Sequence, residues 1–183
     1  MASWVQRMVG AAKLDVATYE EVEADSTATV QAMGVVLLSA LAAGIGEMGS
    51  GGRGIIVGMA ASLIGWVAWA FMTWLIGTKF LAEPETHADV GQLMRTIGFA
   101  ASPGIIQALA WIPILGSLIE LAAWVWMLAA MVVAVRQALD YKGTGKAILV
   151  CAIGWVVNVI IVVSLGALLG IAVLGVKNMA GPS

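Results

Sequence analysis

The stretch AAMVVAVRQALDYKGTGKAILVCAIGW, residues 129–155, decides how the chain folds. Two long apolar runs meet in it, and Arg136, Asp140, Lys142 and Lys146 lie between them. Apolar runs that flank a short charged segment are typical of two membrane helices joined by a loop at the membrane surface. The stretch therefore predicts a polytopic membrane protein.

The composition of the whole chain agrees with this prediction. The 183 residues are 61% hydrophobic and 11% charged, whereas a typical soluble domain is about 45–50% apolar and about 25% charged. The mean hydropathy is +0.99, so there are too few charged side chains to cover a surface exposed to water. The net charge is −2 and no basic block is present, so we expect no nucleic-acid partner.

The lengths of the apolar runs predict an all-α fold with five transmembrane helices. A hydrocarbon core of about 30 Å requires about 20 residues of helix. The forty residues between Arg95 and Arg136 carry one charge, Glu120, and are long enough for two crossings. Pro113 and Gly116 should separate these two crossings. The expected spans are 28–46, 55–78, 97–114, 117–136 and 147–176.

Lysine and arginine residues set the expected orientation. With the N-terminus inside, seven of the nine basic residues lie on the inner side of the five spans. The positive-inside rule then predicts a cytoplasmic N-terminus and a C-terminus outside. The first residues contain no apolar core of signal-peptide length, so we expect no cleaved signal. Within the third span, Pro103 should kink the helix or leave a short helix along the membrane surface.

The N-terminal segment, residues 1–26, precedes a membrane domain at 27–177 and a short tail at 178–183. Its apolar residues recur at helical spacing, which predicts a short amphipathic helix on the inner leaflet. A disordered lead-in is the alternative, because the segment is short. These apolar residues are Trp4, Val5, Met8, Val9 and Ala12.

Several polar residues near the inner surface are candidates for an interaction. Arg136 and Asp140 are four residues apart, which allows a local pair on one helical turn. Alternatively, they contact the acidic segment before the first span and clamp the inner surface of the bundle. The candidate residues of that segment are Tyr19, Glu20, Glu21 and Asp25.

Other candidates lie within the spans. Gln107 and Asn158 can form hydrogen bonds between helices or line a cavity for a ligand. Glu120 either reaches water at the outer end of its span or has a function within the membrane. Gly166 and Gly170 form a small-xxx-small pattern, which favours close helix packing within one chain or between copies.

No pattern of catalytic residues is present in the sequence. His87 has no partner at metal-ligand spacing, and Cys151 lies alone in an apolar run, where a buried small hydrophobe is expected. Ser-His-Asp and Cys/His sets and phosphate-binding glycine loops are also missing. We therefore predict no enzyme activity, no cofactor and no metal site.

Three stretches resemble the bacterial members of the Yip (Ypt-interacting protein) domain family. They are LDVATYEEVEADSTATVQAMGVVLLSALAAGIG at 14–46, LMRTIGFAASPGIIQALAWIPILG at 93–116, and WVWMLAAMVVAVRQALDYKGTGKAILVCAIGW at 124–155. The resemblance implies five spans, a cytoplasmic N-terminus and a location in the bacterial inner membrane. Eukaryotic relatives bind Rab-type GTPases, but this chain lacks their long N-terminal extension, so we expect no GTPase partner.

Two functions follow as hypotheses. The first is a non-catalytic scaffold that shapes the membrane or serves as an accessory subunit, with membrane lipids, further copies of itself or other membrane proteins as partners. The second is a small oligomeric transporter or channel, in which a polar path runs near Glu120, Gln107 and Asn158.

Overall fold

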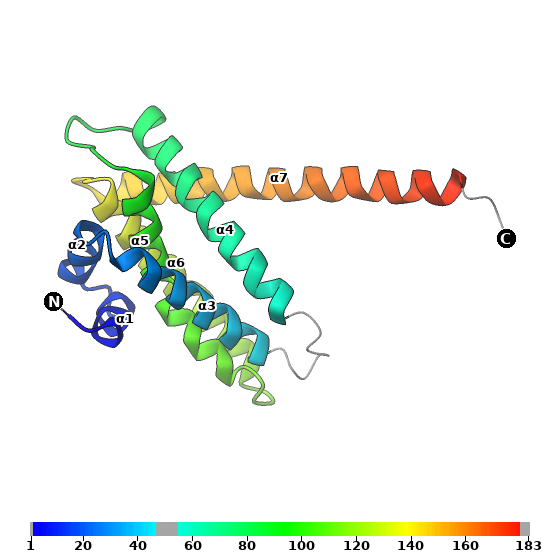
Figure 1. The fold of residues 1–183 in the computed structure, drawn as a ribbon, viewed down its shortest axis with the longest axis horizontal. Coiled ribbons are helices and arrows are strands. Elements are labelled where there is room, and N and C mark those ends of the chain that lie inside the picture. Colours follow the sequence, from blue (N-terminus) through cyan, green and yellow to red (C-terminus); the bar gives the residue numbers. More distant parts are fainter. Residues whose placement is uncertain (1, 47–54, 180–183) are drawn as a thin grey trace.

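The computed structural model describes residues 2–46 and 55–179, with side chains of the last helix described through residue 160 and at Ser164. Over these residues the fold is all-helical, as predicted (Figure 1). The elements are α1 (Trp4–Ala12), α2 (Val16–Ala24), α3 (Ala28–Gly46), α4 (Ile55–Leu75), the π-helical turn η2 (Ile76–Phe80), α5 (Val90–Ala100), the 3-10 helix η3 (Ser102–Leu109), α6 (Gly116–Ala138) and α7 (Thr144–Met179).

Three helices are long and apolar enough to cross a membrane: Ala28–Gly46, Ile55–Phe80 and Gly116–Ala138. They confirm the predicted spans 28–46, 55–78 and 117–136 to within two residues at each end. In Figure 1 they run side by side along one direction. The predicted break before α6 is also present, because Ile114 has a φ of 71° and a side chain on Gly116 would collide with the Ala110 carbonyl.

The predicted third span, 97–114, is wrong as a continuous helix. The helix α5 begins earlier, at Val90, and the chain continues as the 3-10 helix η3. The change coincides with Pro103, which has no N–H to donate, and Ser102 bonds the Phe99 carbonyl at 2.7 Å. With eight residues η3 is unusually long, because 3-10 helices rarely exceed about 3–4 residues.

The segment α5–η3 nevertheless passes from one end of the bundle to the other. At the start, the Ala88 carbonyl accepts a hydrogen bond from Trp74 at the end of α4. At the far end, Gln107 and Ala110 lie against Gly46, the last residue of α3. Between them, η3 passes so close to Ser39 and Met127 that a side chain on Gly104 would collide with both. The narrow 3-10 helix therefore fits between α3 and α6.

The last helix, α7, covers the predicted span 147–176, but lies at a steep angle to the other long helices (Figure 1). Its segment Thr144–Ile160 is apolar and shorter than a full span. It packs against α4, η2 and α6 through Ala147, Val150 and Cys151. The described residues thus contain three helices of spanning length and one shorter apolar helix, which does not confirm five transmembrane helices.

The helices α1 and α2 lie at the end of the bundle where α3 begins (Figure 1). The structure confirms a helix over the predicted amphipathic segment, capped by Ser3, whose hydroxyl accepts from the Gln6 N–H. The side of α1 that is buried carries Arg7 and Ala11, whereas Val5 and Val9 are 62% and 47% exposed. Much of its apolar stripe is therefore turned away from the bundle.

Candidate functional site

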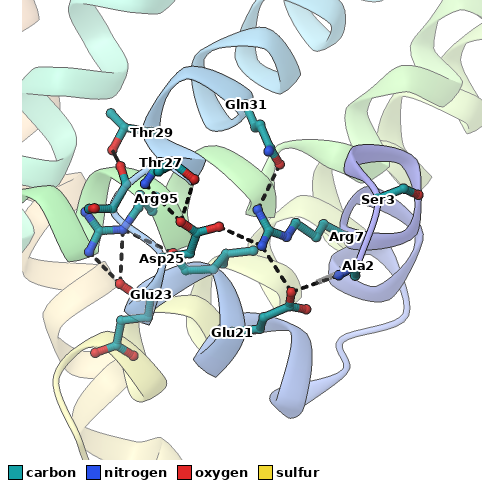
Figure 2. A network of polar contacts seen from close by, with 12 residues as sticks. Ala2, Ser3, Arg7, Glu21, Glu23, Asp25, Thr27, Thr29, Gln31 and Arg95 are labelled. Carbon is teal, nitrogen blue, oxygen red and sulfur yellow. Dashed lines mark hydrogen bonds and ion pairs between the residues drawn. The ribbon is translucent and has the colours of Figure 1, made fainter.

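The most conspicuous polar site lies between α1, α2 and the start of α3, around Arg7 (Figure 2). The Arg7 side chain is 2% exposed. Its Nη2 lies 3.0 Å from Glu21 Oε1 and 2.7 Å from Asp25 Oδ2, and its Nη1 donates to Gln31 Oε1 at 3.0 Å. A buried charge is stable only when it is paired and hydrogen-bonded. One guanidinium therefore joins three helices.

Two backbone N–H groups and one hydroxyl hold the two carboxylates in place for Arg7. The second oxygen of Asp25 accepts from the backbone N–H and the hydroxyl of Thr27, and the Ala2 N–H donates to Glu21 at 3.1 Å. The Thr27 hydroxyl and then Arg7 lower the pKa of Asp25 to about 2. The Ala2 N–H and then Arg7 lower the pKa of Glu21. Both carboxylates thus stay ionised at neutral pH.

A second arginine, Arg95 of α5, fixes the end of α2. It is 8% exposed, and its Nε donates to the Val22 and Glu23 carbonyls at 3.1 and 3.0 Å. The last carbonyls of a helix have no partner within the helix and carry its negative dipole end, so a cation suits them. The expected spans leave Arg95 in the loop between residues 78 and 97, whereas the structure places it in α5, where its side chain caps α2.

The surroundings of the Glu23 side chain disfavour its ionised form. It is half-buried and accepts one hydrogen bond, from Gln92 Nε2 at 3.2 Å. Burial first, and then the nearby Asp140, Glu20 and Asp89 carboxylates, raise its pKa to about 7, while Arg95 acts in the opposite direction. Glu23 therefore exchanges a proton near neutral pH.

The structure places the predicted residues Arg136 and Asp140 without an ion pair between them, among the side chains it describes. Arg136 Nε donates to the Tyr141 carbonyl at 3.4 Å, and Asp140 is exposed with a φ of 51°. Instead, Gln137 reaches the acidic segment, donating to Glu20 Oε1 at 3.2 Å. The polar contact between α2 and α6 is therefore made by Gln137, the residue that follows the predicted Arg136.

The predicted residue Tyr19 has a packing role. It is fully buried, and its hydroxyl donates to the Ala11 carbonyl at 3.1 Å, which ties α2 to α1. Desolvation raises the pKa of this hydroxyl, so it stays protonated. Together with Arg7, it locks the N-terminal helices into one unit.

The segment that follows α4 and the segment between α6 and α7 are also joined to each other. The Tyr141 hydroxyl lies 3.1 Å from the carbonyls of both Gly77 and Leu81, at the π-helical turn. The Thr86 hydroxyl donates to the Leu139 carbonyl at 3.0 Å. Two ion pairs add to this, Lys146 with Glu83 at 3.0 Å and Lys142 with Glu85 at 2.9 Å.

A cavity of about 460 Å³ lies between α3, α4, α5, η3 and α6. Of the three predicted polar residues of the spans, only Gln107 lines it, and this side chain is 9% exposed. Glu120 and Asn158 are exposed on α6 and α7. The fold therefore does not bring these three residues together into one polar path.

The remaining candidates concern metal binding and glycine packing. Within residues 2–46 and 55–179, no group of three or more His, Cys, Asp or Glu side chains is placed to hold a metal ion. His87 is exposed in the loop before α5, and Cys151 is buried. The packing around Gly166 and Gly170 lies outside the described residues.

Sequence reasoning missed Arg7, Arg95 and Glu23. One signal was available for Arg7: it is a basic residue on a short helix that faces an acidic segment within thirty residues. Arg95 and Glu23 gave no such signal, because their surroundings come from helices far apart in the sequence.

Apolar helices of spanning length, capped at one end by buried and paired charges, define the class of this chain as a helical membrane protein. The model of the Yip1 domain matches residues 17–166, which is most of the chain. The chain therefore belongs to the Yip1 domain family. No curated protein and no solved structure matches it.

Proposed function

We propose that this chain is a non-catalytic membrane scaffold or accessory subunit of the Yip type, which crosses the bacterial inner membrane five times. In this proposal α3, α4 with η2, the α5–η3 segment, α6 and α7 are the five crossings. The N-terminus lies in the cytoplasm, because this orientation puts most of the basic residues inside.

The observation that carries the proposal is the rigid cap built around Arg7. Its ion pairs join α1 to α2, and its hydrogen bond to Gln31 ties both to α3. At the same time α1 keeps Trp4, Val5 and Val9 at least 37% exposed. A helix with an exposed apolar face at the end of a membrane bundle suits the interfacial layer of a bilayer. The cap thus supplies a fixed wedge at one leaflet, which is what a membrane-shaping protein requires.

Helix α6 supports a role in assembly. It carries a row of large apolar side chains that are each more than 60% exposed in the single chain. Such a face is covered by lipid or by another membrane helix. The residues of this row are Leu118, Leu121, Trp124, Val125 and Leu128.

Native mass spectrometry of the tagged protein, extracted gently from its own membrane, tests the proposal. We expect either repeated units of 18.9 kDa or co-purifying subunits of a membrane complex. A bare monomer in every lipid condition would contradict the assembly role. Unaltered curvature of vesicles that contain the protein would contradict the shaping role.

The orientation is tested separately with single cysteines in a Cys151→Ser background. A cysteine at Lys13 should resist a membrane-impermeant maleimide in intact cells, and one at Ser183 should react. The reverse pattern would overturn the proposed orientation. Two protected ends would overturn the odd number of crossings.

A further inference from the structure

The cap formed by α1 and α2 meets the long helix α6 near the middle of that helix. Trp126 Nε1 donates to the Ala12 carbonyl at 2.7 Å. Trp126 is close to the midpoint of the 23 residues of α6, which ends at Ala138. At about 1.5 Å per residue, the inner end of α6 is about 18 Å further along its axis. The last residue of α1 therefore lies beside the centre of a helix of spanning length.

Two charged side chains follow this contact directly in the chain. Lys13 and Asp15, in the turn between α1 and α2, are both exposed. Lys13 makes no ion pair with the side chains that the structure describes, and Asp15 accepts a hydrogen bond from the Thr18 hydroxyl at 2.6 Å. An exposed charge is costly in hydrocarbon, so water or lipid headgroups must reach it. A lysine can extend toward them by snorkelling, but the shorter aspartate cannot.

The exposed apolar surface of α6 stops at the same level. Large apolar side chains are exposed from Ile114, in the turn before α6, to Leu128. None of the residues 129–139, all of which the structure describes, is exposed, because α2 and α7 pack against this part of α6. The surface from 114 to 128 is at most about 21 Å long, and the exposed Glu120 lies within it. The hydrocarbon core of a bilayer is about 30 Å thick.

Helix α4, continued by η2, presents a longer apolar surface. Its large exposed side chains begin at Ile56 and end at Phe80, about 36 Å along the axis. Residues 55–78 contain no charged side chain. Gly65 of α4 and Met127 of α6 line the same cavity, so the two helices are level there. The apolar belt of the chain is therefore much shorter along α6 than along α4.

We propose that the bilayer is locally thinned where it meets the α6 side of this chain, because headgroups and water of the cytoplasmic leaflet descend to Lys13 and Asp15. This inference rests on the proposed function, in which α6 crosses the membrane with Ala138 toward the cytoplasm. The short belt leaves a mismatch of roughly 9 Å, which lipids relieve by compressing beside the protein. The lipids that fit this side best have short acyl chains.

Two exposed residues near the level of the shared cavity provide a matched pair of probes. Ile64 on α4 is 71% exposed, and Leu128 on α6 is 62% exposed. Ile64→Cys and Leu128→Cys, each in a Cys151→Ser background, carry a nitroxide in vesicles of dioleoyl phosphatidylcholine. Power-saturation EPR compares the access of oxygen, which concentrates in hydrocarbon, with that of a water-soluble nickel chelate. Lys13→Cys reports whether water reaches the turn, and His87→Cys gives the value for a loop in water.

The label at Leu128 should lie near the headgroups and the label at Ile64 near the bilayer centre. The difference in depth should be roughly 10 Å, since half of the hydrocarbon core is about 15 Å thick. Nickel access at Lys13 should match that at His87. In dimyristoleoyl phosphatidylcholine the shorter chains reduce the mismatch, so the difference in depth should fall by about half or more.

A pair of double variants tests the cause of the thinning. Lys13→Leu with Asp15→Leu removes the charges beside α6, and the Leu128 label should then lie almost as deep as the Ile64 label. The control is Lys142→Leu with Glu85→Leu, which removes one exposed charge of each sign elsewhere. This control should leave both depths unchanged. If the first double variant fails to fold, the comparison of the two lipids in the unaltered cap decides.

Three results would overturn the proposal. The first is an equal depth of the Ile64 and Leu128 labels in dioleoyl phosphatidylcholine. The second is a Lys13 label that the nickel chelate does not reach. The third is a difference in depth that does not change with acyl-chain length. A Leu121→Cys label separates this failure from that of the proposed function: it stays in lipid if only the thinning is wrong, and becomes accessible to the chelate if α6 does not cross the membrane.

Discussion

Replacing Arg7 by methionine should release the N-terminal helices from the bundle. Methionine keeps much of the volume and the helix propensity of arginine, so the main loss is that of the buried charge. Three side chains lose one hydrogen-bond or ion-pair partner each, namely Glu21, Asp25 and Gln31. The helices α1 and α2 should then open without the rest of the bundle unfolding.

The magnitude follows from the burial of the groups left behind. Breaking a buried ion pair by removing one partner costs about 3–5 kcal/mol. Here Glu21 is 36% exposed and regains water, and Asp25, at 13%, keeps its hydrogen bonds from Thr27. We therefore expect the opening free energy of α1 and α2 to fall by about 2–4 kcal/mol, which is roughly a 30- to 900-fold change in the opening equilibrium.

Amide hydrogen exchange of the protein in nanodiscs measures this opening. Protection over residues 4–24 should fall by that factor in Arg7→Met, while protection within α4 and α6 stays unchanged. The control is Lys13→Met, since Lys13 is exposed and makes no ion pair with the side chains that the structure describes. Equal exchange in the two variants would refute the reasoning, because Arg7 would then contribute no more than a surface charge.

Three further predictions concern other parts of the cap and bundle. Glu23 has a folded-state pKa raised to about 7, so the folded protein holds its proton more tightly than the unfolded chain. The free energy of unfolding should therefore fall as the pH rises from about 4.5 through 7, and the melting temperature of Glu23→Gln should depend less on pH over this range. Tyr141→Phe leaves the Gly77 and Leu81 carbonyls without their shared donor and should cost about 1–3 kcal/mol, read from thermal denaturation; an unchanged midpoint would contradict the role of this hydroxyl. A side chain on Gly98 would lie 2.7 Å from Ala32 Cβ, so Gly98→Ala should destabilise the bundle by about 1–3 kcal/mol. The control is Gly145→Ala, which has open space around it and should be neutral or stabilising by less than about 1 kcal/mol. Equal melting points for the two variants would show that α3 and α5 are not in close contact.

The helical segments could be predicted because their cause is local. The apolar runs at 28–46 and 117–136 became helices of nearly those bounds, and Pro113 and Gly116 separated two runs as expected. The third span failed because hydropathy does not distinguish an α-helix from a 3-10 helix. The form at 102–109 depends on the space between α3 and α6, where η3 passes against Ser39 and Met127.

The sequence by itself determined that this chain is an all-helical membrane protein, because apolar run length and local turn residues are properties of short segments. Its membership of the Yip1 domain family rests on the match of residues 17–166 to the family model. Only the tertiary structure decided which charged side chains are buried and which groups they contact. Arg7 meets partners 14, 18 and 24 residues away, and Arg95 caps a helix 73 residues away. It also decided that Gln107 faces a cavity while Glu120 and Asn158 do not. These outcomes depend on how the helices are rotated and spaced against one another, which the pattern of any single helix does not specify.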